Sequence, residues 1–288
     1  MPPFNAPVGR NPEPEPPAKA GARVEGLMNP TLFLILSGVA GLSGFGAAFI
    51  GVGGGILLFP LLLYLPPYFG LAPLDPKTVA ALVISEVFFA GAVGGAAHWQ
   101  RGRVHNRLTV IGAVSSATGA LIGGVGSKWV SEGFLLALFG VITIIAGAMM
   151  FLPTPSLELE EAPMESITVP TLPLVVMALA IGIVVGLLGA GNFLFIPLLI
   201  YVLKIPTRIT IGSSLAIYVL NSLAGFVGKL VTGQIPFVMT LAVIIGASLG
   251  ALVGEKCHSR VSPQFLRHAY SLVVAIVALR IWLTLLAW

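Results

Sequence analysis

The chain has 288 residues, of which 57% are hydrophobic and 9% charged, and its formal net charge is +4. Soluble domains are about a quarter charged, whereas apolar stretches of about 20 residues recur here from Thr31 to the C-terminus. The composition therefore excludes an ordinary soluble domain and predicts an all-α polytopic membrane protein that lies in a lipid bilayer. No run of Lys and Arg is dense enough to suggest a nucleic-acid partner, and the single cysteine, Cys257, excludes an intrachain disulfide and a multi-cysteine metal site.

The hydrophobic runs fall into two halves. Residues 1–29 are rich in proline and polar residues and predict a disordered tail without a secretory signal. The first membrane repeat spans 30–152, an acidic, proline-rich linker spans 153–171, and the second membrane repeat spans 172–288. The predicted elements are 31–52, 56–71, 78–99, 108–125 and 134–152 in the first half, and 172–188, 193–203, 209–231, 237–253 and 268–288 in the second.

One motif occurs in both halves. A glycine-rich segment, Gly53–Gly55, precedes Pro60, and the segment Ala190–Asn192 precedes Pro197 at the same spacing. Glycine weakens a helix, and a proline suits the first turn of a new helix, where its missing N–H costs nothing. Each copy follows a long apolar run, so the pattern predicts a helix broken near the bilayer midplane in each half.

The two halves are predicted to be inverted relative to one another. Five elements per half is an odd number, so the second half begins on the opposite side of the membrane. Eight Lys and Arg residues near helix ends fall in loops predicted inside, against three in loops predicted outside. The positive-inside rule therefore places both termini outside the cytoplasmic (inner) membrane.

Inverted repeats with helices broken at corresponding places are typical of secondary transporters, whose substrate binds where the breaks meet. Helix N-termini carry partial positive charge and free N–H donors, so two such breaks favour a small anionic substrate. The simpler alternative is that the glycines only permit close packing. Polar residues on the eighth element, 209–231, could also line the cavity. The predicted substrate-binding residues are Gly53, Gly54, Gly55, Ala190, Gly191, Asn192, Ser213, Ser214 and Asn221.

Glu86 is an isolated acid near the centre of the third element. A carboxylate at membrane depth is costly to bury, so it predicts either proton coupling or a neutral acid hydrogen-bonded to a neighbouring helix. Basic residues mark the ends of the two longest elements: Lys77, His98, Arg208 and Lys229. They fit topology anchors that snorkel to the surface, or else groups that attract anions to the pathway.

The doubled glycine-rich segment before a proline, the hydrophilic central linker and the helix ends HWQRGRV and KLVTGQI resemble the sulfite exporter TauE/SafE family. The resemblance covers about residues 31–288. It implies a secondary carrier that exports a small sulfur-containing or organic oxyanion, such as sulfite or an organosulfonate. The second copy of the motif has Ala190 and Asn192 in place of glycines, which favours a side-chain contact from Asn192.

Other functional classes remain as alternatives. An anion channel would share the same sequence features as a carrier. The pattern Gly41-Leu42-Ser43-Gly44 matches rhomboid-type intramembrane serine proteases, with His98 as the base, but it is short for so glycine-rich a chain. The four histidines are not clustered, which disfavours a metal site or metal transport. We expect no enzyme activity and no cofactor, and the sequence leaves open whether the chain forms a homo-oligomer.

Overall fold

The computed structural model describes residues 30–50, 54–99, 105–150, 169–258, 276 and 279–283. The tail 1–29, most of the linker 153–171 and most of the predicted last element, 268–288, lie outside these residues. The described elements are helices, without a β-strand among them. They are α2 (Pro30–Ile50), α3 (Gly55–Tyr64), η1 (Pro66–Phe69), α4 (Pro76–Trp99), α5 (Asn106–Gly126), α6 (Glu132–Met150), α7 (Thr171–Leu188), η4 (Asn192–Leu194), α8 (Phe195–Tyr201), α9 (Thr207–Val231) and α10 (Phe237–His258).

The predicted all-helical membrane architecture is confirmed. Five of the described helices, α2, α5, α6, α7 and α10, are long and apolar enough to cross a bilayer, so the protein is a multi-pass membrane protein. Helix α3 has 10 residues and α8 has 7. At 1.5 Å per residue these helices are about 15 and 10 Å long, half of a hydrocarbon core or less. The element after each glycine-rich segment is therefore a short helix inside the bundle.

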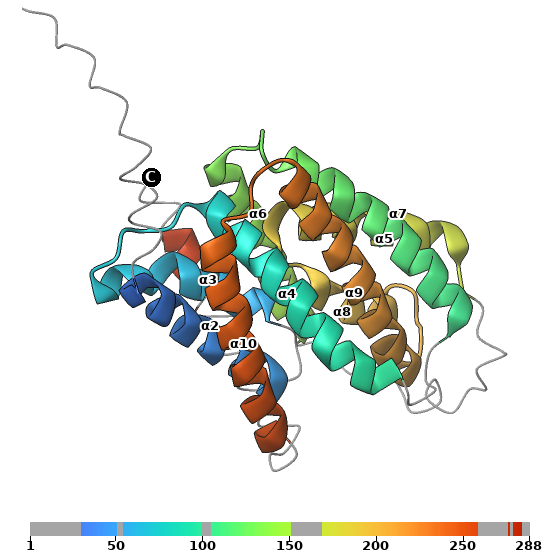
Figure 1. The fold of residues 1–288 in the computed structure, drawn as a ribbon. Coiled ribbons are helices and arrows are strands. Elements are labelled where there is room, and N and C mark those ends of the chain that lie inside the picture. The colour runs from blue at the N-terminus through green and yellow to red at the C-terminus, as the bar shows by residue number, and fades with distance from the viewer. Residues whose placement is uncertain are drawn as a thin grey trace, which may run out of the picture.

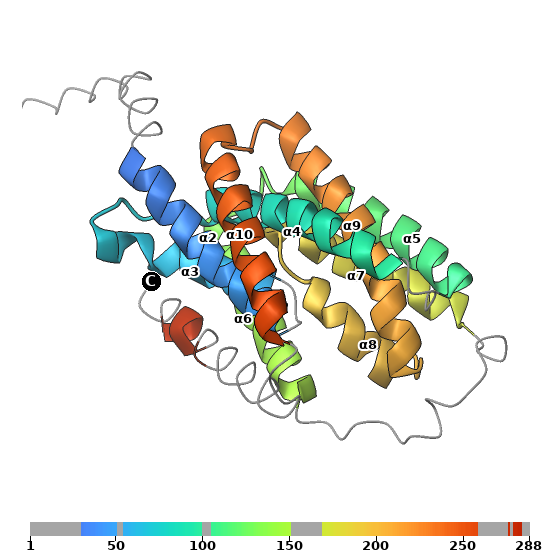
Figure 2. The ribbon, with the colours of Figure 1, turned by 60° about the horizontal axis from the view of Figure 1, so that its bottom comes forward.

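Helices from the two halves pack against each other in pairs. Figure 1 shows α2 beside α10 at one end of the bundle and α5 beside α7 at the other, with α4 and α9 between them. Figure 2 shows the same order from another side. In each pair one helix comes from the first half of the chain and one from the second. The main helix–helix interfaces therefore join the halves.

Glycines allow the backbones of α2 and α10 to touch. A Cβ atom at Gly246 or Gly250 would overlap the backbone carbonyl of Ser37 or Gly41, respectively. From the other side, a Cβ at Gly44 would lie 2.8 Å from the Cα of Ala247. Small residues at such positions let membrane helices approach closely, which increases packing where no hydrophobic effect drives association.

Helices α5 and α7 use the same device. A Cβ at Gly119 or Gly123 would overlap carbonyls of α7, and a Cβ at Gly182 or Gly186 would overlap carbonyls of α5. The contacts advance in the same direction along both helices, so the pair is parallel. Glycines at close backbone contacts therefore form both of these interfaces between the halves.

Helices α4 and α9 run antiparallel. Lys77, at the start of α4, donates through Nζ to the carbonyl of Lys128 after α5, at 2.9 Å. Lys128 donates in turn to the carbonyl of Thr232 after α9, at 3.4 Å. The start of α4 and the end of α9 thus lie at the same end of the bundle. An antiparallel pair of repeat-related helices is what inverted halves require, and the inversion of the complete halves stays a prediction.

Two glycines of α2 provide a test of this packing. Gly44→Ala places a methyl group against the backbone of Ala247, whereas Gly38→Ala places it where nothing lies within 4 Å. We expect Gly44→Ala to destabilise the protein by about 1–3 kcal/mol, the usual cost of overpacking. Gly38→Ala should be neutral or slightly stabilising because alanine favours helix. Thermal unfolding in detergent, followed by size-exclusion chromatography, measures the stability of both variants. Equal melting temperatures would contradict the close contact between α2 and α10.

Candidate functional site: the two chain breaks

The first chain break is held by the carbonyl of Gly54. This carbonyl accepts hydrogen bonds from the backbone N–H of Leu57 at 3.0 Å and of Leu58 at 2.9 Å, which begin α3. It also accepts a bond from the Ser43 hydroxyl of α2 at 3.2 Å. A carbonyl at a helix start is satisfied in this way inside the bundle, as a break in an apolar environment demands.

The second break follows α7. Gly189 ends the helix with φ of +73°, and Gly191 has φ of +141°, conformations that residues with a side chain rarely adopt. The backbone N–H of Leu194 bonds to the carbonyl of Gly191 at 2.9 Å and so begins the η4–α8 segment. Leu57 and Gly54 make the equivalent bond in the first half, although Gly54 has helical backbone angles and Gly191 does not.

The two breaks touch each other. A Cβ atom at Gly55 would lie 3.2 Å from the Cα of Ala190 and 3.3 Å from the carbonyl oxygen of Gly189. Gly55 and Ile56 open α3, and the first N–H groups of a helix have no intrahelical acceptor. Backbone donors therefore lie at the contact between segments that are distant in the sequence.

Two asparagines extend the second break toward α9. The Nδ2 of Asn221 donates to the Oδ1 of Asn192 at 2.8 Å, and both side chains are buried. The other polar atoms of the pair, Asn192 Nδ2 and Asn221 Oδ1, are buried without a hydrogen-bond partner in the part of the chain that the structure describes. A buried amide donor without a partner is costly, so Asn192 Nδ2 is available for a ligand.

Glu86 lies against the first break. A Cβ at Gly54 would overlap the Oε1 of Glu86 and lie 2.6 Å from its Cδ. The carboxyl group is 2% exposed, and its Oε2 has no hydrogen-bond partner among the described residues. Among the described residues no neighbouring helix satisfies Oε2, and both proton coupling and a neutral hydrogen-bonded acid stay predictions for Glu86. Glu86 is eleventh in the 24-residue helix α4, far from both helix ends.

One feature of the predicted break is wrong. Pro60 was expected in the first turn of its helix, but it lies inside α3, which begins five residues earlier at Gly55. The cause is that Gly54 already caps the helix through its carbonyl, so the helix begins before the proline. Gly53, predicted to supply a backbone donor, lies outside the described residues.

The predicted serines occupy other positions. Ser213 accepts a hydrogen bond from the backbone N–H of His105 at 3.2 Å, next to the start of α5. Ser214 is buried and its hydroxyl has no partner among the described residues. Both precede Asn221 by about two turns of α9, or about 11 Å. They lie nearer the start of α9 and do not join the two asparagines.

Lys229 is not a snorkelling anchor. Its side chain is fully buried, and Nζ donates to the hydroxyl of Ser127 at 2.7 Å and to the carbonyl of Leu187 at 3.2 Å. Ser127 donates to the Oε1 of Gln234 at 2.8 Å. The ammonium group thus lies at the C-terminal ends of α5 and α7, where helix dipoles favour a cation.

Sequence reasoning missed Ser127 and Gln234. Each lies in a short polar turn directly after a helix, GSK or TGQ, and such turns usually carry no tertiary role. Four basic residues at helix ends were predicted as anchors or anion-attracting groups, and Lys229 is one of them. Of the other three, Lys77 donates to a backbone carbonyl, whereas the side chains of His98 and Arg208 lie outside the described residues. No cluster of His, Cys, Asp or Glu among the described residues could hold a metal ion.

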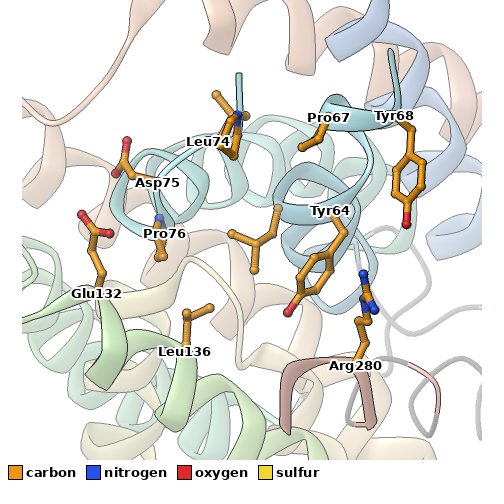
Figure 3. Close-up of a pocket in the computed structure, with 11 residues that line it drawn as sticks. Tyr64, Pro67, Tyr68, Leu74, Asp75, Pro76, Glu132, Leu136 and Arg280 are labelled. Carbon is orange, nitrogen blue, oxygen red and sulfur yellow. The ribbon is translucent and has the colours of Figure 1, made fainter. Parts of the chain in front are cut away.

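A cavity of about 550 Å³ lies away from the two breaks, at the C-terminal end of α3. Figure 3 shows Tyr64 and Arg280 on one side and Asp75 and Glu132 on the other. Asp75 accepts a hydrogen bond from the backbone N–H of Thr78 at 2.8 Å and so caps α4, and Arg280 lies 5.4 Å from the ring centre of Tyr64. Asp75 and Arg280 therefore have local structural partners, and the breaks remain the candidate site.

Comparison with known proteins places the chain in a family of membrane transporters. Residues 35–281 match the family model described as Sulfite exporter TauE/SafE. A probable membrane transporter protein of Xylella fastidiosa (strain 9a5c) is 29% identical, over 88% of this chain and 98% of that relative. Probable membrane transporter proteins of Bacillus subtilis (strain 168) and Methanocaldococcus jannaschii are 24% and 22% identical, over 83% and 86% of this chain and 94% and 93% of theirs. No solved structure matches the chain.

The contact between Gly54 and Glu86 can be tested by a double-mutant cycle. Gly54→Ala places a methyl group where the carboxyl group lies, so we expect it to destabilise the protein by about 1–3 kcal/mol. In a Glu86→Ala background the space is free, so the same change at position 54 should cost much less. The difference is the coupling energy of the two positions. Additive effects on unfolding in detergent would show that the two residues are not in contact.

Proposed function

Since the chain belongs to the sulfite exporter TauE/SafE family of membrane transporters, we propose that it is a secondary transporter that exports a small sulfur-containing or organic oxyanion. Sulfite and organosulfonates are the substrates we favour. In this proposal the protein lies in the cytoplasmic membrane with both termini outside, and access to the substrate alternates between its two sides.

One observation carries the proposal: the two chain breaks touch, and a buried amide donor without a partner lies in the second break. The N-terminus of α3 carries roughly +0.5 charge and N–H donors at Gly55 and Ile56. Asn192 adds a side-chain donor that only the second copy of the motif possesses. Together these groups suit an anion with several oxygen acceptors, without needing a fixed positive charge at the same point.

The protease alternative has little support from the same geometry. The Ser43 hydroxyl donates to the carbonyl of Gly54, so it fixes the backbone of the first break. The relatives are named as membrane transporters, which leads us to propose transport and no enzymatic step. Because the substrate site in this proposal contains only donors from the chain itself, no cofactor enters it.

A flux measurement tests the proposed function. Purified full-length protein in proteoliposomes should move sulfite and methanesulfonate faster than empty liposomes do, with saturation at high concentration as expected for a carrier. A carboxylate such as acetate serves as the comparison for anion shape. Transport of a divalent cation, with no anion moved or bound, would overturn the proposal, and flux without saturation would favour an anion channel.

Asn192→Leu tests the site itself. Leucine has a similar volume but no donor, so we expect methanesulfonate to bind at least about tenfold more weakly, as for a lost hydrogen bond to a charged group. Binding is measured by calorimetry, after size-exclusion chromatography shows that the variant is folded. Thr240→Val is the matched control, because Thr240 is also buried with an unpartnered hydroxyl but lies in the first turns of α10. Unchanged binding in Asn192→Leu would remove this residue from the site.

A further inference from the structure

Glu86 and the proposed substrate compete for one place. We propose that the ionised Glu86 carboxylate occupies the anion position at the N-terminus of α3 when no substrate is bound, so that substrate binds only when Glu86 carries a proton. This inference rests on the proposed function and adds to it the means by which an anion and a proton move together.

The geometry places a carboxyl group where an anion is favoured. The contact of Glu86 with Gly54 puts its oxygens at the residue that caps α3, one position before the first free N–H groups. Carboxylates are stabilised at helix N-termini by the same dipole and donors that stabilise a bound oxyanion. Position 54 must be glycine for this approach, since any side chain would displace the carboxyl group.

Neither solvent nor a hydrogen bond to Oε2 from the described residues stabilises a negative charge on Glu86. The side chain is 2% exposed, and its Oε2 finds no hydrogen-bond partner in the described part of the chain. A structural carboxyl group would be expected to have both oxygens satisfied. An acid with one free oxygen, directed at a helix start, instead resembles a ligand that the chain supplies to itself.

The described helices around Glu86 carry their other charged residues in their first or last turns. Helices α2, α3 and α7 carry no Asp, Glu, Lys, Arg or His. The elements packed against Glu86 have their ionisable residues in first or last turns, apart from Tyr218, whose ring packs against Phe195. These end residues are Tyr64 of α3; Lys77 and His98 of α4; Glu132 of α6; Arg208 and Lys229 of α9; and Glu255, Lys256, Cys257 and His258 of α10. Each of these residues is separated along its own helix from the level of Glu86, which is eleventh in the 24-residue helix α4.

An ionised Glu86 excludes the substrate because both are negatively charged. Two anions at one helix N-terminus repel each other strongly in a medium of low dielectric constant, so the arriving substrate requires a neutral Glu86. A protonated carboxyl group no longer competes, and its O–H becomes a donor for an oxygen of the substrate. The proton comes from the aqueous phase on the side from which the anion enters, and both leave on the other side.

The test uses methanesulfonate, because this anion does not itself take up protons near neutral pH. Binding to the full-length protein in detergent is measured by calorimetry from about pH 5 to about pH 9, in buffers that differ in ionisation enthalpy, which reports protons taken up per anion bound. We expect affinity to fall as pH rises, by up to about tenfold per pH unit for one linked proton. Proton uptake should approach one per anion in the same range.

Glu86→Gln keeps the shape of the side chain and removes its charge. This variant should bind methanesulfonate at every pH with the affinity that the unmodified protein shows at low pH, and it should take up no proton. Glu132→Gln is the control, since it removes a carboxylate at the start of α6, and it should retain the full pH dependence. If Glu86→Gln fails to fold, proton uptake by the unmodified protein decides.

Two results would overturn the inference: pH-independent binding without proton uptake by the unmodified protein, or weaker binding by Glu86→Gln at every pH. The latter would mean that the charge of Glu86 helps to hold the substrate. These results leave the proposed function standing, because the anion still binds. If the unmodified protein binds no methanesulfonate or sulfite at any pH, the proposed function fails and the inference fails with it.

Discussion

An interrupted helix in a membrane protein must have its backbone polar groups satisfied by protein, water or ligand, because hydrocarbon offers no hydrogen bond. Most of the arrangement around the two breaks follows from this constraint. The Gly54 carbonyl is satisfied by α3 and by the hydroxyl of Ser43, and the ends of α5 and α7 are satisfied by Lys229. The groups around the breaks without a protein partner among the described residues are the first N–H groups of α3, Glu86 Oε2, Asn192 Nδ2 and Asn221 Oδ1. The proposed substrate site lies where polar groups lack hydrogen-bond partners.

The pairing of helices from the two halves explains how these groups come together. Because α2 packs on α10 and α5 on α7, the two halves lie side by side and their breaks meet at Gly55 and Ala190. Ser43 of α2 and Glu86 of α4 reach the first break, while Asn221 of α9 reaches the second. A site made from one half alone would have only one of the two breaks.

The sequence predicted most of the fold and only part of the site. Hydrophobic runs bounded by Gly, Pro and charged residues locate the helices because membrane helices depend on length and apolarity, and both can be read directly. The repeated glycine–proline motif predicted that two distant segments matter, and the contact between Gly55 and Ala190 agrees with it. The starting residue of α3 was not predictable from Pro60, since the Gly54 carbonyl at the helix start is also bound by Ser43 of α2, a tertiary neighbour.

Individual side chains were harder to predict because their partners come from other helices. Asn192 was selected by its place in the motif, but its bond to Asn221 required the packing of η4 against α9. Lys229 at a helix end has the pattern of a surface anchor, and only the polar turns containing Ser127 and Gln234 make a buried position tolerable. No periodicity or composition encodes such a network, which depends on where separate helix ends meet.

The pairing of helices from the two halves also affects how the chain assembles in the membrane. The glycine faces of α2 and α5 have no partner within the first half, since Gly44 meets α10 and Gly119 meets α7. While the first half has been inserted and the second has not, these faces contact lipid, and the first break has no α7–η4 segment against it. The native bundle therefore closes only after α10 has entered the bilayer, late in synthesis, and the two halves need each other to fold.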